Sequence, residues 1–151
     1  GRITDKQSFK KNLLCLLVIN VVGIITYYNS FYASFVFDDI YSILNNEYIK
    51  DISNFYPWNI HDLPSHISRR FISYLTLAVN YQFGEYNVFG YHVFNLTIHL
   101  VNAVLVYFLV ISLYHTPRLK NIYHSDDQRR FAALFAALLF VCHPLQTQAV
   151  T

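Results

Sequence analysis

The chain has 151 residues, of which 54% are hydrophobic, 18% aromatic and only 13% charged. Soluble domains carry about 25% charged residues, so this composition indicates a membrane protein. The net charge of +2 is too small for a nucleic-acid-binding surface, and the 13 Phe and 13 Tyr exclude a disordered chain. Because the sequence contains no Met, even at position 1, we expect it to be a fragment of a longer protein.

Three uncharged segments predict three transmembrane helices. Residues 12–37 are 26 residues without a formal charge, which as a helix exceed the roughly 30 Å hydrocarbon core. The second helix is expected at 88–114. The third is expected at 131–151, where it opens with FAALFAALLFVC. A cleaved signal peptide is the alternative for the first segment, but the apolar run is too long and lacks a clear cleavage site.

The distribution of Lys and Arg predicts the orientation, because cytoplasmic loops retain positive charge. The tail at 1–11 has four basic residues against one acid, and the loop at 115–130 has four against two. The segment at 38–87 has three basic residues against six acids. We therefore expect the tail and the 115–130 loop in the cytoplasm and residues 38–87 outside. The predicted class is an all-α, polytopic helical membrane protein fragment with a large external first loop.

The external loop has two parts with different patterns. Residues 41–68 mix Asn, Asp, Pro and His with aromatics, which indicates short helices and turns over the membrane surface. Residues 70–84 show helical spacing of apolar side chains, with Gly84 as the expected end. Fifteen residues cannot cross a bilayer, so this amphipathic segment is predicted to be an interfacial or re-entrant helix.

An acidic pair, Asp38 and Asp39, follows the first predicted span. Adjacent acids point in different directions, so we expect one to face a substrate as a general base while its neighbour binds a cation or caps a helix. The pair is therefore also a candidate site for a divalent cation. The alternative is a solvated helix end with an N-capping Asp.

Further polar residues are predicted at the same membrane surface. Arg69 and Arg70 open the interfacial helix, where a guanidinium suits the phosphate of a lipid carrier or, alternatively, anchors the helix at the interface. Tyr91 and His92 belong to the outer end of the second span, and His143 to the outer part of the third. We predict these five residues to bind substrate.

The second span also carries polar side chains along its length. His92, Asn95, His99 and Asn102 share one helix face because they follow the spacing i, i+3, i+7 and i+10. This face is either a polar track below the site or a helix-to-helix hydrogen-bonding surface. For Asn95, His99 and Asn102 the second interpretation is favoured.

The order of motifs resembles a known family. FVFDD, then an Arg-led helix ending in NYQFGEYNVFGYHVFNLTIHLVNAVLVYF, then FAALLFVCHPLQTQAVT looks like the N-terminal part of membrane proteins with a glycosyltransferase C-type fold. These are similar to protein O-mannosyltransferases, and most similar to bacterial proteins with C-terminal tetratricopeptide repeats and to their animal relatives in the endoplasmic reticulum. The resemblance covers about residues 12–151, and any repeats would lie beyond Thr151.

The resemblance implies sugar transfer from a polyprenyl-phosphate-linked donor to an acceptor hydroxyl, on protein or glycan, at the outer or lumenal face. It implies that Asp38 or Asp39 is the base, that Arg70 is the Arg that begins the amphipathic helix, and that His143 contacts substrate or phosphate. Phe71 stands where many relatives have Pro. We expect a bacterial plasma membrane, or the endoplasmic reticulum membrane in a eukaryote. The competing hypothesis is a noncatalytic membrane scaffold or assembly subunit.

Overall fold

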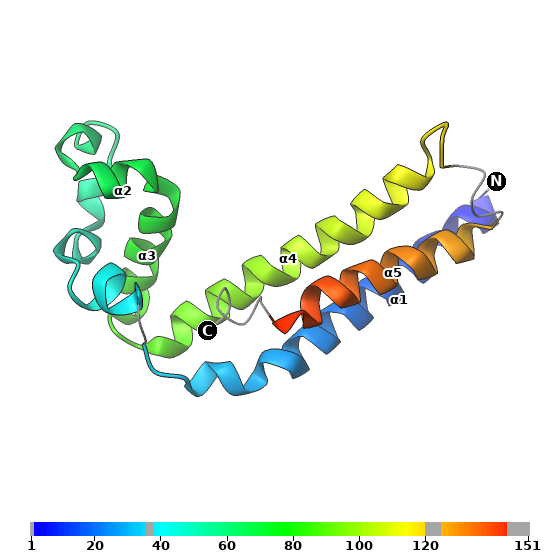
Figure 1. The fold of residues 1–151 in the computed structure, drawn as a ribbon, viewed down its shortest axis with the longest axis horizontal. Helices are drawn as coiled ribbons and strands as arrows, with labels where there is room; N and C mark the ends of the chain where they lie inside the picture. Colours follow the sequence, from blue (N-terminus) through cyan, green and yellow to red (C-terminus); the bar gives the residue numbers. More distant parts are fainter. Residues whose placement is uncertain (1, 36–37, 120–124, 145–151) are drawn as a thin grey trace. The chain divides into compact units, whose positions relative to one another are not determined.

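The computed structural model describes residues 2–35, 38–119 and 125–144, and for residues 2–5 it describes the backbone alone. Within these residues every regular element is a helix, so the predicted all-α class is confirmed (Figure 1). The elements are α1 (Arg2–Tyr27), α2 (Ser65–Arg69), α3 (Phe71–Gly84), α4 (Val88–Tyr114) and α5 (Asp126–Cys142), with short 3-10 or π-helices at Tyr28–Tyr32, Ile40–Leu44, Glu47–Lys50, Ile52–Phe55 and Ile60–Asp62.

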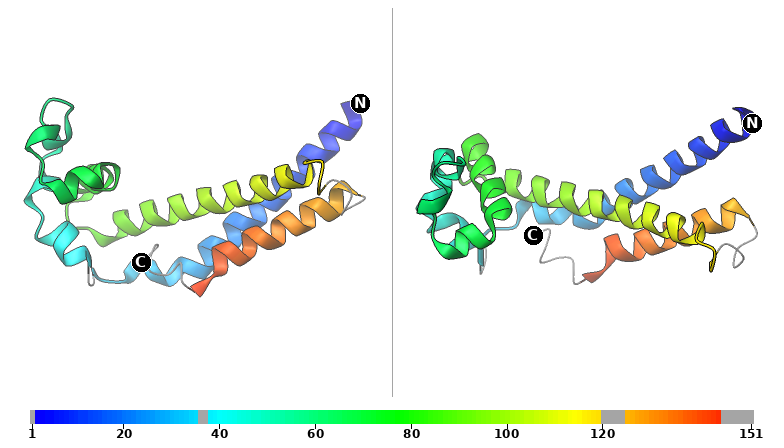
Figure 2. Two further views of the ribbon diagram at one scale, coloured as in Figure 1. Left: turned by 45° about the horizontal axis from the view of Figure 1, so that its top comes forward. Right: turned by 90° about the horizontal axis from the view of Figure 1, so that it is seen from above.

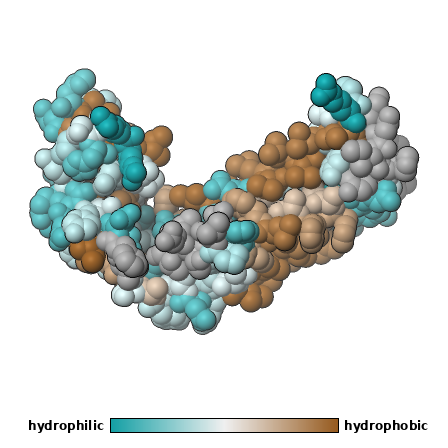
Figure 3. All heavy atoms as spheres, in the orientation of Figure 1, coloured by the Kyte–Doolittle hydropathy of each residue, from teal (hydrophilic) through white to brown (hydrophobic). Residues whose placement is uncertain are grey.

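The chain divides into two compact units. The first unit contains residues 1–30 and 95–151, and the second contains residues 31–94. In Figure 3, hydrophobic side chains cover much of the first unit, whereas hydrophilic ones dominate the second. This contrast agrees with a membrane-embedded first unit and a water-exposed second unit.

Two helices in the described residues are long and apolar enough to cross a membrane, at Lys6–Tyr32 and Val88–Tyr114. The prediction of three spans is therefore corrected to two. The helix α5 has 17 residues, and its first turn contains Asp126 and Asp127. The uncharged part, Phe131–Cys142, spans only about 18 Å, against a hydrocarbon core of roughly 30 Å. The end of the predicted third span, residues 145–151, lies outside the described residues.

The start of α5 is set by local hydrogen bonds. The Ser125 side chain accepts a hydrogen bond from the Gln128 backbone N–H, and the Gln128 side chain accepts one from the Ser125 backbone. This capping box satisfies two backbone donors that the first helical turn cannot pair. The helix therefore begins before the charged residues rather than at Phe131.

The core of the first unit combines three alanines with larger side chains. The helix α5 packs against α1 (Figure 2). The fully buried members are Ile19 of α1, Ala103 and Tyr107 of α4, and Ala133, Ala137 and Val141 of α5. Alanines four residues apart on α5 let the helix backbones approach closely, which is how membrane helices gain van der Waals contact in the absence of a hydrophobic driving force.

Close packing also explains Gly23 of α1. A Cβ atom at this position would overlap the Cδ2 atom of Leu100 on α4 and lie 3.0 Å from the Cγ2 atom of Val141 on α5. Contacts at such distances force neighbouring atoms to move. A glycine at position 23 therefore leaves room for side chains of α4 and α5 to approach α1.

We expect Gly23→Ala to lower the free energy of unfolding by about 1 kcal/mol, because an overpacking cost of about 1–3 kcal/mol exceeds the gain of about 1 kcal/mol in helix propensity. Gly90→Ala is the matched control, since a Cβ there comes no closer than 3.9 Å to a neighbouring atom, the Oδ1 of Asn80. The control should be neutral or stabilising. Thermal unfolding in detergent, followed by circular dichroism, measures both. Equal effects of the two substitutions would contradict this account.

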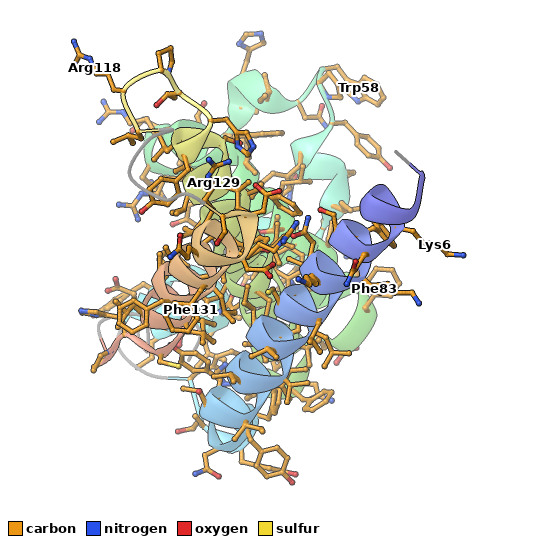
Figure 4. The ribbon with its side chains drawn as sticks, turned by 90° about the vertical axis from the view of Figure 1, so that its right-hand side faces the viewer. Lys6, Trp58, Phe83, Arg118, Arg129 and Phe131 are labelled. Carbon is orange, nitrogen blue, oxygen red and sulfur yellow. The ribbon has the colours of Figure 1, made fainter. Side chains whose placement is uncertain are left out.

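The second unit has its own core, built around α3. Its buried members are Ile43, Ile49, Phe55, Leu63, Ile67, Ala78 and Tyr91. The α3 face with Phe71, Leu75 and Ala78 packs into this core. Away from this face, Ile72 is 76% exposed, and Phe83, which Figure 4 labels, is 90% exposed. The apolar face predicted from helical spacing is therefore used mainly inside the unit, and a second apolar strip remains outside.

The predicted end of α3 at Gly84 is confirmed, but the unusual backbone lies one residue later. Glu85 has φ 50° and ψ −116°, and the Asn87 N–H donates to the Gly84 carbonyl at 2.8 Å. This is the geometry of a type II′ turn, whose first central position favours Gly. A non-Gly residue in such a region carries strain of about 1–3 kcal/mol.

We expect Glu85→Gly to raise the free energy of unfolding by about 1 kcal/mol, since Gly adopts this conformation without steric cost and loses part of the gain to chain entropy. Glu85→Ala removes the same carboxylate but keeps the strain. It should bring no such gain. Chemical unfolding of the unsubstituted protein and the two variants measures these effects. If Glu85→Ala stabilised the protein as much as Glu85→Gly, the gain would come from removal of the charge and not from relief of strain.

Candidate functional site

The acidic pair lies in the second unit, directly before the π-helix Ile40–Leu44. The helical stretch that starts with α1 ends at Tyr32, so Asp38 follows six residues later rather than at the helix end. Asp38 is exposed and Asp39 is half-buried. Asp39 occupies the N-cap position, but its side chain makes no capping hydrogen bond. The capping part of the alternative therefore does not apply to Asp39, whereas the exposure of Asp38 agrees with its other part, a solvated helix end. π-Helical turns occur often at functional sites.

The segment before the acidic pair is held by the start of α4. The Nε2 atom of His92 lies 3.1 Å from the Ala33 carbonyl oxygen, and because a carbonyl can only accept, this nitrogen carries the proton. The rings of Phe35 and Tyr91 meet edge to face at 5.4 Å. The Tyr91 hydroxyl donates to the Glu85 carbonyl at 2.9 Å. Two predicted substrate-binding residues therefore hold the chain that leads to Asp38.

Burial supports this positioning role. His92 is 1% exposed and Tyr91 is 3% exposed within the structure. A buried polar group without a partner costs free energy, and both side chains have the partners described. Direct contact of Tyr91 or His92 with substrate stays a prediction.

The segment after the acidic pair is anchored as well. Ile43 of the π-helix is buried in the core of the second unit. The buried Asn46 side chain donates to the Ser42 carbonyl at 3.2 Å and accepts from the Tyr48 N–H at 3.0 Å. Contacts thus hold the described chain at residues 33–35 and again from Ile43 onward, on either side of the two carboxylates, and a catalytic group needs support of this kind.

Arg69 and Arg70 lie at the junction between α2 and α3, and both are exposed. The Arg70 N–H donates to the Ile67 carbonyl at 3.0 Å, and the Arg70 carbonyl accepts from Tyr74 at 3.1 Å. Phe71 packs its ring against Phe55 at 5.8 Å. The helix was predicted to begin at Arg70, and it begins one residue later, at Phe71, with Arg70 at the N-cap position. Within the described residues no ion pair joins either arginine to the acidic pair.

His143 belongs to the first unit, directly after the last residue of α5. Its backbone N–H donates to the Phe140 carbonyl at 3.4 Å, and its side chain is exposed. Asp38, Asp39, Arg69, Arg70, Tyr91 and His92 belong to the second unit. The predicted meeting of His143 with the acidic pair stays a prediction.

Lys50, the third cation of the predicted external loop, was not singled out by the sequence analysis. The Nζ atom of Lys50 donates to Glu47 at 2.6 Å, and the Gln82 side chain donates to the Lys50 carbonyl at 3.0 Å. Hydrogen bonds to Glu47 and then to Tyr86 raise the pKa of Lys50. The available signal was that Lys50 is the only Lys between residues 38 and 87. Its ammonium remains charged at neutral pH and suits phosphate or sugar oxygens.

His99 has the helix-to-helix role that its position on α4 predicts. Its Nε2 atom lies 3.2 Å from the Val141 carbonyl oxygen near the end of α5, where backbone carbonyls lack helical partners. Its ring also stacks on Phe140 at 5.1 Å and meets Tyr27 edge to face at 5.3 Å. For His99 the structure confirms the helix-to-helix hydrogen-bonding interpretation rather than the polar-track interpretation.

Comparison with known proteins gives relatives but no structural match. No family model and no solved structure matches the chain. Protein O-mannosyl-transferase Tmtc3 of Drosophila melanogaster is 33% identical over 96% of this chain and 17% of its own length. Human protein O-mannosyl-transferase TMTC3 is 31% identical over 87% of the chain and 14% of its own length. Human protein O-mannosyl-transferase TMTC4 is 33% identical over 89% of the chain and 19% of its own length.

The chain thus spans about a sixth of the length of these curated relatives. All three are animal proteins, so the expectation of a bacterial plasma membrane receives no support from them.

Proposed function

Because this chain resembles the protein O-mannosyl-transferases along nearly its whole length, we propose that it is part of an integral-membrane glycosyltransferase. The similarity is the observation that carries this proposal. Two helices that are apolar enough to cross a membrane support the membrane location. For a eukaryotic source we propose the endoplasmic reticulum membrane.

The proposed reaction transfers a sugar from a polyprenyl-phosphate carrier to a hydroxyl of a protein acceptor at the lumenal face. The names of the relatives favour mannose as the sugar and protein as the acceptor. The scarcity of Lys and Arg in residues 38–87, which contain three against four in each of the much shorter segments 1–11 and 115–130, favours the non-cytosolic side. A lipid-linked donor suits an enzyme whose acidic pair lies on a loop that follows a membrane helix.

In the proposed mechanism, one carboxylate of the acidic pair takes the proton from the acceptor hydroxyl. The hydroxyl oxygen forms a bond to the anomeric carbon while the bond between that carbon and the phosphate oxygen breaks. The phosphate leaves with the electron pair and gains negative charge, which Arg69 or Arg70 would stabilise. Tyr91 and His92 hold the segment before Asp38 in place through the contacts described above.

A divalent cation fits only in part. In the described residues no three His, Cys, Asp or Glu side chains are grouped for metal binding. Two adjacent carboxylates resemble the sparse protein ligation of Mg²⁺, which keeps several waters and adds substrate phosphate oxygens. Asp38 and Asp39 would therefore hold such an ion only together with the donor phosphate, where it would neutralise the leaving group.

The test is sugar transfer by purified full-length protein. Radiolabelled polyprenyl-phosphate mannose is offered with a pool of unfolded secretory polypeptides, and label in protein is measured. We expect incorporation from the lipid-linked sugar and none from a nucleotide-linked sugar. Absence of transfer from both donors, by protein that is folded and membrane-inserted, would favour the noncatalytic scaffold instead.

A further inference from the structure

The helix α4 carries polar side chains that the first unit leaves uncovered. Its buried positions, among them Leu96, Ala103 and Tyr107, lie on one side of the helix. Asn102 is exposed and Asn95 is half-buried, although both lie within the apolar span Val88–Tyr114. His99 is buried in the first unit, whereas these two asparagines are not.

The partly or fully exposed residues of α4 repeat every seven residues, a spacing that is typical of the contact between two packed helices. Asn95, Asn102 and Leu109 are seven residues apart, and Ile98, Leu105 and Ser112 form a second set with the same spacing, offset by three residues. We call these six residues the α4 seam. Ile98, Leu105 and Leu109 are 45%, 59% and 58% exposed. Positions spaced three and four residues apart form the contact line between two helices that cross at a shallow angle.

Contact of the Asn102 amide with lipid would be unfavourable, because this residue lies near the middle of the apolar span. The span Val88–Tyr114 has 27 residues, so its middle residue is Val101, and Asn102 is the next. An amide at the bilayer centre has neither water nor lipid head groups to bond with, and polar side chains at this depth normally face another helix. One amide offers both donors and an acceptor, which suits a hydrogen-bonding side chain on a facing helix.

We propose that the α4 seam packs against a further membrane-spanning helix of the same polypeptide, and that this helix presents a hydrogen-bonding side chain to Asn102 near the bilayer centre. The occupant is assigned to the same polypeptide because the relatives are about six times longer than this chain. The inference rests on the proposal that this chain is part of such a longer protein. It does not depend on the protein being catalytic.

Photo-cross-linking in membranes identifies the occupant. A photoreactive amino acid replaces Asn102 in the full-length protein, and a second variant carries it in place of Leu109. After irradiation, the cross-linked peptides are mapped by mass spectrometry. We expect both probes to reach one apolar segment beyond residue 151, at sites one to two helical turns apart. Cross-links between two copies, adducts with lipid alone, or no cross-link at all would each overturn the proposal.

A stability measurement gives an independent sign. If Asn102 pairs with another helix, Asn102→Leu lowers the midpoint of thermal unfolding of the full-length protein by about 2 °C. Asn102→Gln lowers the midpoint by less. If Asn102 faced lipid, Leu would be neutral or stabilising, because Leu is favoured at the bilayer centre. Val101→Leu, an exposed neighbour outside the seam, is the control and should leave the midpoint unchanged. An unchanged or raised midpoint for Asn102→Leu contradicts the proposal even where sugar transfer is normal.

Discussion

Replacement of Asp38 or Asp39 by Asn in the full-length protein is expected to reduce sugar transfer by about 10²–10⁴-fold for whichever residue is the base. An amide keeps the size and most hydrogen bonds of the carboxylate but cannot take the acceptor proton. The other position should show a smaller loss, because its role is limited to charge or cation binding. Initial rates with lipid-linked mannose, at saturating donor, measure both effects.

The control for this experiment is Asp62→Asn, which changes an exposed carboxylate in the same unit. It should leave the rate within about two-fold, since a surface carboxylate away from special contacts contributes little. Thermal unfolding of each variant shows that the fold is retained. Normal transfer by both Asp38→Asn and Asp39→Asn would remove the acidic pair from the mechanism.

Replacement of Arg130 by Met is expected to destabilise the first unit by about 3 kcal/mol, because hydrogen bonds that involve a charged group contribute about 1.5–3 kcal/mol each. The Arg130 side chain is only 12% exposed. Its guanidinium donates to the Asn12 side chain at 2.9 Å, to Asp127 at 2.8 Å and to Ser8. Tyr107 of α4 donates to the same Asn12 oxygen at 3.1 Å. Arg130 is therefore the centre of a polar contact among three helices.

The matched control is Arg118→Met, since Arg118 is an exposed arginine that projects from the chain after α4 (Figure 4). Its loss should change the free energy of unfolding by no more than about 0.5 kcal/mol. Arg130→Lys should recover part of the stability, because a single ammonium cannot reach three partners as a planar guanidinium does. Equal destabilisation by the Arg118 and Arg130 substitutions would argue against the polar contact.

The same contact predicts a pH dependence. A hydrogen bond from Lys11, with a further one from Arg130, lowers the pKa of Asp127 below its usual 3.8. Because the folded pKa is depressed, this contribution is fully present above the unfolded pKa and is lost as pH falls through the folded pKa. The midpoint of unfolding should therefore drop below about pH 4, and Asp127→Asn should reduce that drop.

Local patterns in the sequence were sufficient for much of this fold. The uncharged run at 88–114 coincides with α4, and the segment after Arg70 forms α3 and ends at Gly84. Helical periodicity, charge-free length and terminating residues act within one or two turns, so a single stretch of chain contains the information. Within the described residues the third span was wrong, because an uncharged run does not show how long the continuous helix is: α5 has 17 residues, with two acids in its first turn.

The candidate site depended far more on tertiary contacts. The sequence alone indicated the acidic pair and the exposed arginines, since each is visible as a short motif. It predicted that Tyr91 and His92 bind substrate, which stays a prediction. Only the structure shows that both side chains are buried against residues 33–35, more than fifty positions away.

What the sequence by itself determined is the helical class, two segments long and apolar enough to cross a membrane, the helices α3 and α4, and the resemblance to O-mannosyl-transferases. Only the tertiary structure decided which polar residues are interior supports, as with His99 and Arg130, and which stay exposed, as with Asn102. The physical reason is that a side chain's free energy depends on the partners it meets. Asn12 and Arg130 are 118 residues apart in the sequence, and no local pattern shows that they are in contact.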